Sequence, residues 1–220
     1  MPVTITINGK DYQVKENQSI LEACRDAGIN IPTLCYHPSL SVVGSCRVCV
    51  VEVEGARNLS PACATQVSDG MKIKTSSERV NKAVRFNLGL LLSNHPNECM
   101  TCDVNGRCEF QDLIYQYDVK DMFPKTLRNV SYDTSSPSLF RDMNKCIDCG
   151  RCVRACDELQ GLSILSPVNR GYHVLPLPAL GAPIAATDCI NCGQCSVACP
   201  VGAITERMEF RDVITALRKH

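Results

Sequence analysis

Cys146-Ile-Asp-Cys149-Gly-Arg-Cys152-Val-Arg-Ala-Cys156 is followed later in the chain by a second copy, Cys189-Ile-Asn-Cys192-Gly-Gln-Cys195-Ser-Val-Ala-Cys199, with Pro200 directly after it. Both copies have the spacing C-x2-C-x2-C-x3-C, which is typical of a pair of 4Fe–4S clusters. In such a pair the fourth cysteine of each copy binds the cluster held by the other copy. The repeat therefore predicts one cluster at Cys146, Cys149, Cys152 and Cys199, and another at Cys156, Cys189, Cys192 and Cys195. Two zinc ions are the alternative, but zinc usually takes its four ligands from two C-x2-C pairs.

A second cysteine set lies nearer the N-terminus, with the spacing C-x10-C-x2-C-x13-C. Its members are Cys35, Cys46, Cys49 and Cys63. Four thiolates suit a 2Fe–2S cluster, although the first spacer is longer than in the plant-type C-x4-C-x2-C pattern. A zinc ribbon is the alternative. The strand-rich segment that precedes these cysteines favours the 2Fe–2S cluster.

A third set lies between the other two and combines one histidine with three cysteines. It consists of His95, Cys99, Cys102 and Cys108, with the spacing H-x3-C-x2-C-x5-C. Taken alone, this set is equally typical of a zinc site. Beside three other cluster motifs, a 4Fe–4S cluster with one imidazole ligand is the better prediction. The alternative for His95 is a residue at the end of a helix, where a histidine interacts favourably with the last turn.

These sets include all of the sixteen cysteines except Cys24, which we expect to be a free buried thiol in a helix. His37 lies close to Cys35 and is expected to be a loop residue, or to donate a hydrogen bond near the 2Fe–2S site. The N-terminus has neither the charged start nor the apolar run of a signal peptide, which predicts a cytoplasmic protein. Clustered cysteines in a reducing compartment favour metal binding over disulfides.

The composition excludes several classes of partner. The net charge is zero, which favours neither nucleic acid nor an anionic membrane surface. No apolar run approaches the roughly 18 residues needed to span a membrane. No G-x-G-x-x-G or P-loop motif is present, and no Ser/His/Asp arrangement stands out. The chain is therefore expected not to be catalytic alone.

The order of elements predicts an α+β chain of several modules. Residues 1–78 are expected to form a β-grasp domain: a hairpin at Asn8-Gly9-Lys10, a helix capped by Ser19 and Glu22, and further strands at 48–53 and 71–75. Residues 79–119 are expected to form a small helical 4Fe–4S domain, and 120–141 a linker. Residues 142–206 are expected to form a ferredoxin-like domain with a hairpin-like insertion at 163–186, and 207–220 a terminal helix.

The three cysteine sets in this order carry a specific resemblance. The segments IPTLCYHPSL, GSCRVCVVEVEG, PACAT and LLLSNHPNECMTC, followed by GRCEFQDL and the twin motif, resemble the N-terminal cluster region of multidomain iron hydrogenases. Similar regions occur in NAD-linked formate dehydrogenases, in the diaphorase-side small subunit of NAD-reducing nickel–iron hydrogenases, and in the large iron–sulfur subunit of respiratory complex I. The resemblance covers essentially the whole chain. Every ligand position of the family has its counterpart here, in His95 and the fifteen cysteines of the three sets.

The resemblance implies one 2Fe–2S cluster, three 4Fe–4S clusters and a relay of electrons. The sequence stops at His220, where the proteins that it resembles continue into catalytic domains. The resemblance therefore implies a separate electron-transfer subunit. The implied partners are a flavin-containing NAD(P)H dehydrogenase-type subunit and a hydrogenase or formate dehydrogenase catalytic subunit. Ferredoxin is a further partner if the complex is of the electron-bifurcating type. A fragment of an iron hydrogenase or formate dehydrogenase, a free polyferredoxin and a zinc-stapled interaction module are the alternatives.

Overall fold

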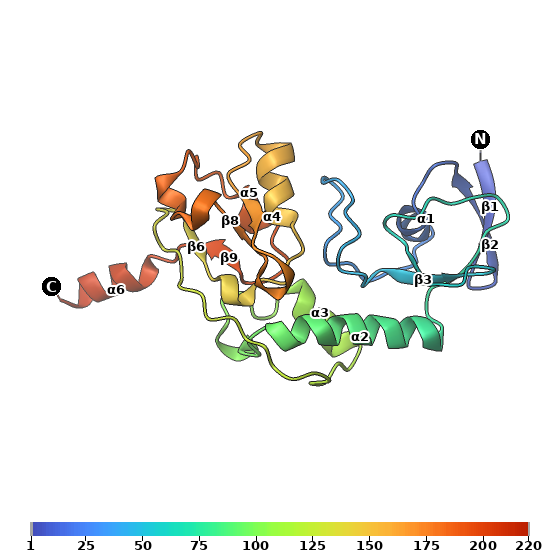
Figure 1. The fold of residues 1–220 in the computed structure, drawn as a ribbon, viewed down its shortest axis with the longest axis horizontal. Coiled ribbons are helices and arrows are strands. Elements are labelled where there is room, and N and C mark those ends of the chain that lie inside the picture. The colour runs from blue at the N-terminus through green and yellow to red at the C-terminus, as the bar shows by residue number, and fades with distance from the viewer. Residues whose placement is uncertain (1, 220) are drawn as a thin grey trace.

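A five-stranded sheet forms the N-terminal end of the protein in the computed structural model, which describes residues 2–219 (Figure 1). The strand order is β2-β1-β5-β3-β4, with β1 parallel to β5 and the other pairs antiparallel. The strands are β1 Pro2–Ile7, β2 Lys10–Lys15, β3 Val50–Val53, β4 Ser60–Pro61 and β5 Lys72–Lys74. The predicted hairpin, helix and later strands are confirmed in that order, although β3 begins two residues later than expected.

Helix α1, Ile20–Asp26, packs on this sheet and is fixed by local chemistry at its first turn. The Ser19 side chain accepts a hydrogen bond from the Glu22 amide, and the Glu22 carboxylate accepts one from the Ser19 amide at 2.8 Å. This predicted capping box satisfies two amides that a helix start leaves unpaired. Cys24 lies on the buried face of α1 and is fully buried, as predicted. The loop from α1 to β3 carries Cys35 and Cys46.

The 17-residue helix α2, Glu78–Asn94, joins the two lobes of the molecule and lies along both of them (Figure 1). Its N-cap is Ser77, and its buried face contains Val80, Val84, Leu88 and Leu92. Leu91 is partly buried beside this face and packs against the same core. The helix ends at Asn94, and His95 is its C-cap directly before Pro96, since proline cannot continue the hydrogen-bond ladder. After a turn of 3-10 helix at Cys99–Thr101, helix α3 covers Glu109–Gln116.

The C-terminal lobe is built around the two copies of the repeat. Its helices are α4 Arg151–Arg154, continued by a π turn at Ala155–Leu159, and α5 Gln194–Val197. Its strands are β6 Leu139–Arg141 with β9 Ile204–Glu206, and β7 Ser166–Val168 with β8 Leu175–Leu177. Single 3-10 turns occur at Met143–Lys145, Gly171–His173, Ala179–Gly181 and Ile184–Ala186. The β7–β8 pair confirms the expected hairpin-like insertion.

The segment expected to be a linker, 120–141, makes several contacts with the C-terminal lobe. Its last residues form β6, and the β6 residue Arg141 is almost completely buried. Arg128 binds Asp148 at 2.5 Å, and Val130 exchanges backbone hydrogen bonds with the Asn144 side chain. Residues 120–138 contain no helix or strand, as suits a linker, but these contacts fix the segment against the C-terminal lobe.

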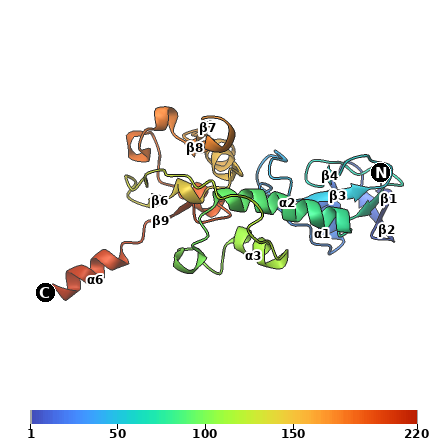
Figure 2. The same ribbon diagram turned by 60° about the horizontal axis from the view of Figure 1, so that its bottom comes forward.

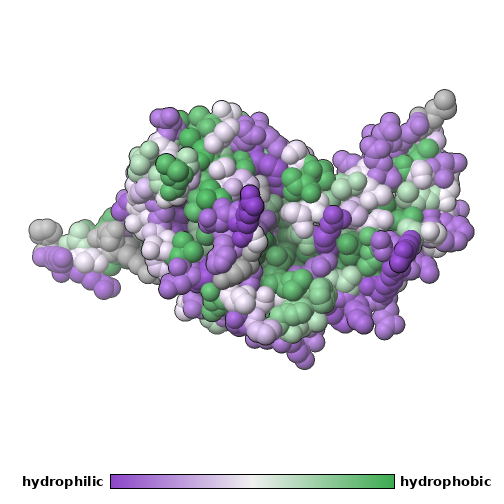
Figure 3. Space-filling model, in the orientation of Figure 1, coloured by the Kyte–Doolittle hydropathy of each residue, from purple (hydrophilic) through white to green (hydrophobic). Residues whose placement is uncertain are grey.

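One continuous core connects the modules, because residues of the first loop, of α2 and of the repeat belong to the same buried cluster. Hydrophobic side chains also reach the surface in the hollow between the lobes and along α2 (Figure 3). Helix α6, Phe210–Arg218, extends away from the C-terminal lobe in both ribbon views (Figure 2), and His220 lies outside the described residues. No helix among residues 2–219 is long and apolar enough to cross a membrane.

Candidate metal centres

The first centre lies where the loop after α1 meets the ends of β3 and β4. Cys35, Cys49 and Cys63 are buried there, and Cys46 is half-buried. The sulfurs form two pairs. Cys49 Sγ donates to Cys63 Sγ over 3.4 Å, and a similar bond joins Cys46 to Cys35. The bond from Cys46 lowers the pKa of Cys35 to about 5, and the same bond with burial raises the pKa of Cys46.

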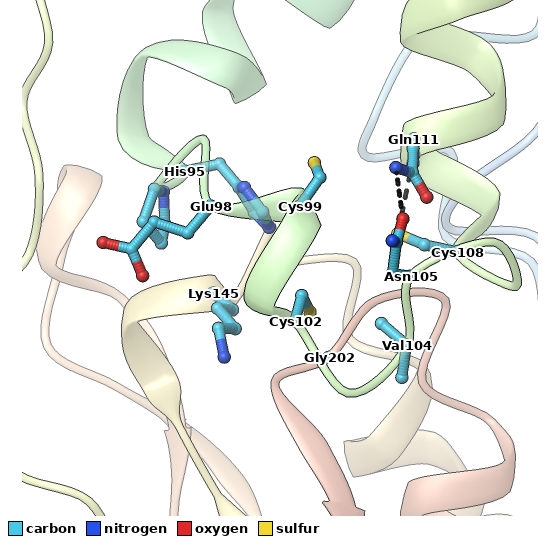
Figure 4. A pocket seen from close by; sticks show the side chains of 11 residues that line it. His95, Glu98, Cys99, Cys102, Val104, Asn105, Cys108, Gln111, Lys145 and Gly202 are labelled. Atoms are coloured by element: carbon cyan, nitrogen blue, oxygen red, sulfur yellow. Dashed lines mark hydrogen bonds between the residues drawn. The ribbon is translucent and has the colours of Figure 1, made fainter.

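The second centre is a small cavity between the end of α2 and the start of α3 (Figure 4). Its lining includes all four residues of the histidine-containing set: His95, Cys99, Cys102 and Cys108. His95 is the C-cap of α2, and Cys108 is the N-cap of α3, where its Sγ accepts from the Gln111 amide at 3.5 Å. Helix ends thus position the first and last members of this set.

His95 faces this cavity from a buried position with 8% of its surface exposed. Burial is the main cause that lowers the pKa of its imidazole to about 4. The ring packs edge-on against Phe110, with 5.3 Å between the ring centres. A neutral, fixed imidazole has the free nitrogen lone pair that metal ligation needs.

The third centre is another small cavity, and residues from both copies of the repeat line it. Its four cysteines are Cys146, Cys149, Cys152 and Cys199. The remaining lining is largely apolar and includes Met143, Ile147, Pro176, Val201, Ala203 and Ile204. Burial raises the pKa of Cys149 to about 12, while backbone hydrogen bonding and the charges of Arg151 and Arg154 oppose this shift. The chain therefore surrounds these thiols with apolar walls and nearby cations.

The two copies of the motif have the same backbone path. Asp148 and Gly150 in the first copy have φ of 53° and 66°, and Asn191 and Gly193 in the second have 57° and 77°. Asp, Asn and Gly are the residues that adopt this left-handed conformation most readily. The sequence I-D/N-C-G thus turns the chain so that successive cysteines point inward. The amide of Asp148 also donates to Cys146 Sγ at 3.4 Å.

The fourth set lies in the same lobe and is more exposed than the third. Cys195 is buried, Cys156 and Cys189 are half-buried, and Cys192 is exposed. Burial, followed by the nearby thiols of Cys189 and Cys192, raises the pKa of Cys195 to about 11. Cys156 lies on the π turn after α4, which contacts the helix α5 that carries Cys195.

Comparisons with known proteins match each module to a cluster-binding family. Residues 1–78 match the family described as a 2Fe-2S iron-sulfur cluster binding domain. Residues 85–122 match the NADH-ubiquinone oxidoreductase-G iron-sulfur binding region, and residues 145–203 match a 4Fe-4S dicluster domain. A chain in the crystal structure of an NAD+-reducing [NiFe]-hydrogenase superposes with a TM-score of 0.87 and 31% identity, over 93% of this chain and 87% of that chain. The protein belongs to this family of modular iron–sulfur electron-transfer chains.

Other members of the family are longer. The NADP-reducing hydrogenase subunit HndD of Solidesulfovibrio fructosivorans is 46% identical over 98% of this chain and 38% of its own length. An NADH-quinone oxidoreductase chain of Rhizobium meliloti is 37% identical over 92% of this chain and 24% of its own length. The NADPH-Fe(3+) oxidoreductase subunit alpha of Geobacter sulfurreducens is 38% identical over 95% of this chain and 25% of its own length. The chain thus spans well under half of each of these curated relatives.

Several residues around the candidate centres were not found from the sequence. Arg151 binds Glu109, beside Cys108, through two bonds of 2.7 and 2.9 Å. Lys145 and Gly202 line the cavity of His95. No spacing rule marks these residues, because their roles depend on contacts between modules far apart in sequence. His37, by contrast, is a loop residue as expected, and its Nδ1 accepts from the Ser39 amide at 3.2 Å.

Proposed function

We propose that this chain relays electrons through one 2Fe–2S and three 4Fe–4S clusters, between a flavin-containing NAD(P)H-oxidising subunit and a catalytic subunit. A hydrogenase is the first candidate for that catalytic subunit. The observation that carries the proposal is the cavity that Cys199 of the second repeat copy shares with Cys146, Cys149 and Cys152 of the first. This exchange of the fourth cysteine is the arrangement that a two-cluster ferredoxin-like domain requires.

The first centre fits a 2Fe–2S cluster. Its four thiols are arranged as two pairs, Cys35 with Cys46 and Cys49 with Cys63, and we assign one pair to each iron. The order of the five strands, with α1 packed on the sheet, is the arrangement that the predicted β-grasp domain requires. The loop before Cys46 depends on Gly44, whose φ of 58° is unfavourable for other residues.

The second centre fits a 4Fe–4S cluster with His95, Cys99, Cys102 and Cys108 as ligands. The donor chemistry suits it, since three thiols and one neutral imidazole line the cavity. A close approach of backbone completes the cradle: a Cβ atom on Gly202 would lie 2.9 Å from Cys102 Sγ. We assign the third cluster to Cys146, Cys149, Cys152 and Cys199, and the fourth to Cys156, Cys189, Cys192 and Cys195.

Ligand geometry favours clusters over the zinc alternative. A zinc ion needs its cysteine sulfurs at about 2.3 Å from one point. Among residues 2–219, no group of three or more His, Cys, Asp or Glu side chains is arranged to hold a single ion. Cavities with sulfurs around their walls suit a larger inorganic group.

The clusters would supply one-electron chemistry, and the chain's own residues would set their environment. Amides of Gln111 and Asp148 donate to the sulfurs of Cys108 and Cys146. Hydrogen bonds to sulfur, burial and ligand type are the means by which a protein sets cluster potentials. No residue is required as a general acid or base in this function.

The partners follow from what the relatives are called, and they are part of the proposal. The relatives include an NADP-reducing hydrogenase subunit and an NAD+-reducing hydrogenase chain. A formate dehydrogenase subunit, ferredoxin as a further partner, electron bifurcation and a cytoplasmic location stay predictions from the sequence. The same cluster region could also belong to a longer catalytic chain, because the longer relatives contain it.

Anaerobic reconstitution tests the cluster assignment, and native purification tests the partners. The assigned clusters require about fourteen irons per chain. About eight irons per chain, with zinc also present, would mean that only the repeat holds clusters and would refute the other two cluster sites. The reconstituted chain alone should accept electrons from dithionite but oxidise neither NAD(P)H, hydrogen nor formate. Turnover by the isolated chain would refute the electron-relay proposal.

A further inference from the structure

Arg154 is a buried cation, 7% exposed, that is surrounded by backbone carbonyls. Its Nη2 donates to the carbonyl of Cys35 at 2.6 Å and to that of Cys149 at 3.2 Å. Its Nη1 donates to the carbonyl of Ser41, and its Nε to that of Gly150 at 3.3 Å. Within residues 2–219, no Asp or Glu forms an ion pair with it, whereas Arg128, Arg141 and Arg151 each have one.

Two of these carbonyls belong to proposed ligands of different clusters. Cys35 belongs to the first set and Cys149 to the third, so one guanidinium joins the two sites. Removing a charge from water is unfavourable unless other charges compensate it. Metal-bound cysteines are thiolates, so the two ligand sets that Arg154 joins would be anionic and would compensate its charge, together with the Glu158 carboxylate, which also interacts with Arg154.

The loop 35–41 has two further contacts with the same part of the C-terminal lobe. Leu40 packs with Ala155 and Ala198 in a small buried cluster. The Glu158 carboxylate accepts from the Ser41 amide at 2.7 Å and also from the Ser41 hydroxyl. In the ribbon views this loop extends from the N-terminal lobe toward α4 (Figures 1 and 2). Arg154 therefore lies at the centre of an interface between the lobes.

We propose that Arg154 is a positioning residue that couples the first and third clusters. Its hydrogen bonds hold the loop of Cys35 against α4, and its positive charge favours the reduced form of both neighbouring clusters. This inference rests on the proposed function, since it requires clusters at both cysteine sets. Arginine is needed for the double role, because its planar fork reaches two carbonyls at once and the ammonium of lysine is a single point charge.

The test uses Arg154→Gln and Arg154→Lys in the full chain after anaerobic reconstitution. Iron content and low-temperature electron paramagnetic resonance are measured first, so that a missing cluster is recognised as a failure of the proposed function. Redox titrations followed by the same resonance then give each cluster's potential. Amide hydrogen exchange of residues 36–41 reports on the position of the loop.

Arg154→Gln should lower the reduction equilibrium constants of the first and third clusters about tenfold each, or 59 mV for a one-electron couple. Arg154→Lys should keep both constants within about threefold, since the charge remains. Both variants should increase amide exchange in 36–41 roughly tenfold, since neither side chain can bridge the carbonyls. Arg25→Gln is the matched control, because Arg25 lies over the ring of Tyr36, beside Cys35, but is exposed to solvent. This variant removes a positive charge of the same size that water already screens.

Three results would overturn the proposal. The first is that Arg154→Gln leaves both potentials and the exchange unchanged while all clusters are present. The second is that it shifts all four clusters equally, and the third is that Arg25→Gln produces the same shifts. If Arg154→Gln does not retain its clusters, the lysine variant decides: unchanged exchange in 36–41 would refute the positioning role.

Discussion

Gly202→Ala tests the histidine-containing site at the point where the repeat packs against it. A Cβ atom at Gly202 would lie 2.9 Å from Sγ of Cys102 and 3.1 Å from Cγ2 of Val104. Ordinary contacts of this kind are about 3.5–4.0 Å long, so Cys102 and the segment of Gly202 would separate by roughly 0.6 Å or more. Functional constellations tolerate displacements of only about 0.5 Å. The added methyl group should therefore disturb this ligand set selectively.

Two measurements give the expected magnitude for Gly202→Ala. The free energy of unfolding should fall by about 1–3 kcal/mol, the usual range for overpacking a filled site. The iron content after anaerobic reconstitution should fall from about fourteen to about ten, because one 4Fe–4S cluster is lost and the other clusters remain. Electron paramagnetic resonance should show which signal disappears.

Gly89→Ala is the matched control, because Gly89 and Gly202 are both outside the left-handed region that only glycine adopts easily. A Cβ at Gly89 would lie 3.1 Å from Met122 Sδ and 3.2 Å from a ring carbon of Phe123, side chains that can rotate away. Alanine also favours a helix by about 1 kcal/mol over glycine, so this variant should keep its full iron content. If Gly202→Ala also keeps its iron and an unchanged resonance spectrum, the proposed contact between the repeat and Cys102 is wrong.

Three other variants probe the remaining features. His95→Cys should retain a 4Fe–4S cluster with a lower potential in redox titration, because the anionic ligand disfavours an added electron. His95→Ala should lose only that cluster. An unchanged electron paramagnetic resonance spectrum of His95→Ala would show that His95 is only a helix-end residue. Glu109→Ala should lower the unfolding free energy by about 1–3 kcal/mol in urea titrations, because it leaves the buried guanidinium of Arg151 without its carboxylate. Asp112→Ala removes an equal charge at an exposed position and should lower the unfolding free energy by about 0.5 kcal/mol or less. If Glu109→Ala and Asp112→Ala lower it equally, the pair of Arg151 with Glu109 has no structural role. Cys24→Ala should cost about 1 kcal/mol through a small cavity but leave the iron content unchanged, and lost iron would place Cys24 among the ligands.

Short-range patterns predicted the elements around the metal sites well. Ser19 and Glu22 form the capping box that the sequence indicates, and Pro96 follows the end of α2. These signals succeed because the groups that interact are only a few residues apart, so the chain's own stereochemistry decides the outcome. The cysteine spacing works in the same way, since short spacers leave few ways to arrange the thiols.

Contacts between modules could not be predicted in this way. The segment 120–141 was expected to be a linker, yet Arg141 pairs across the lobe with Asp133 and with the carbonyl of Pro176. Arg154 lies between two cysteines of the first motif copy, at a position to which the spacing assigns no chemical role. Its partners Cys35 and Ser41 lie more than a hundred residues earlier. Such residues are recognised only when the fold brings distant carbonyls together.

The two copies of the repeat illustrate why ligand identity alone does not determine the properties of a cluster. Their backbones turn at equivalent residues, Asp148 and Asn191, and each copy supplies four cysteines. Their surroundings differ, because Cys149 is enclosed by the cavity of the third centre whereas Cys192 is exposed. Solvent exposure and nearby charge both change the energy of adding an electron to a buried anionic group. We therefore expect two cubes with the same type of ligands to titrate at different potentials, and equal potentials would show that the ligands outweigh this difference in environment.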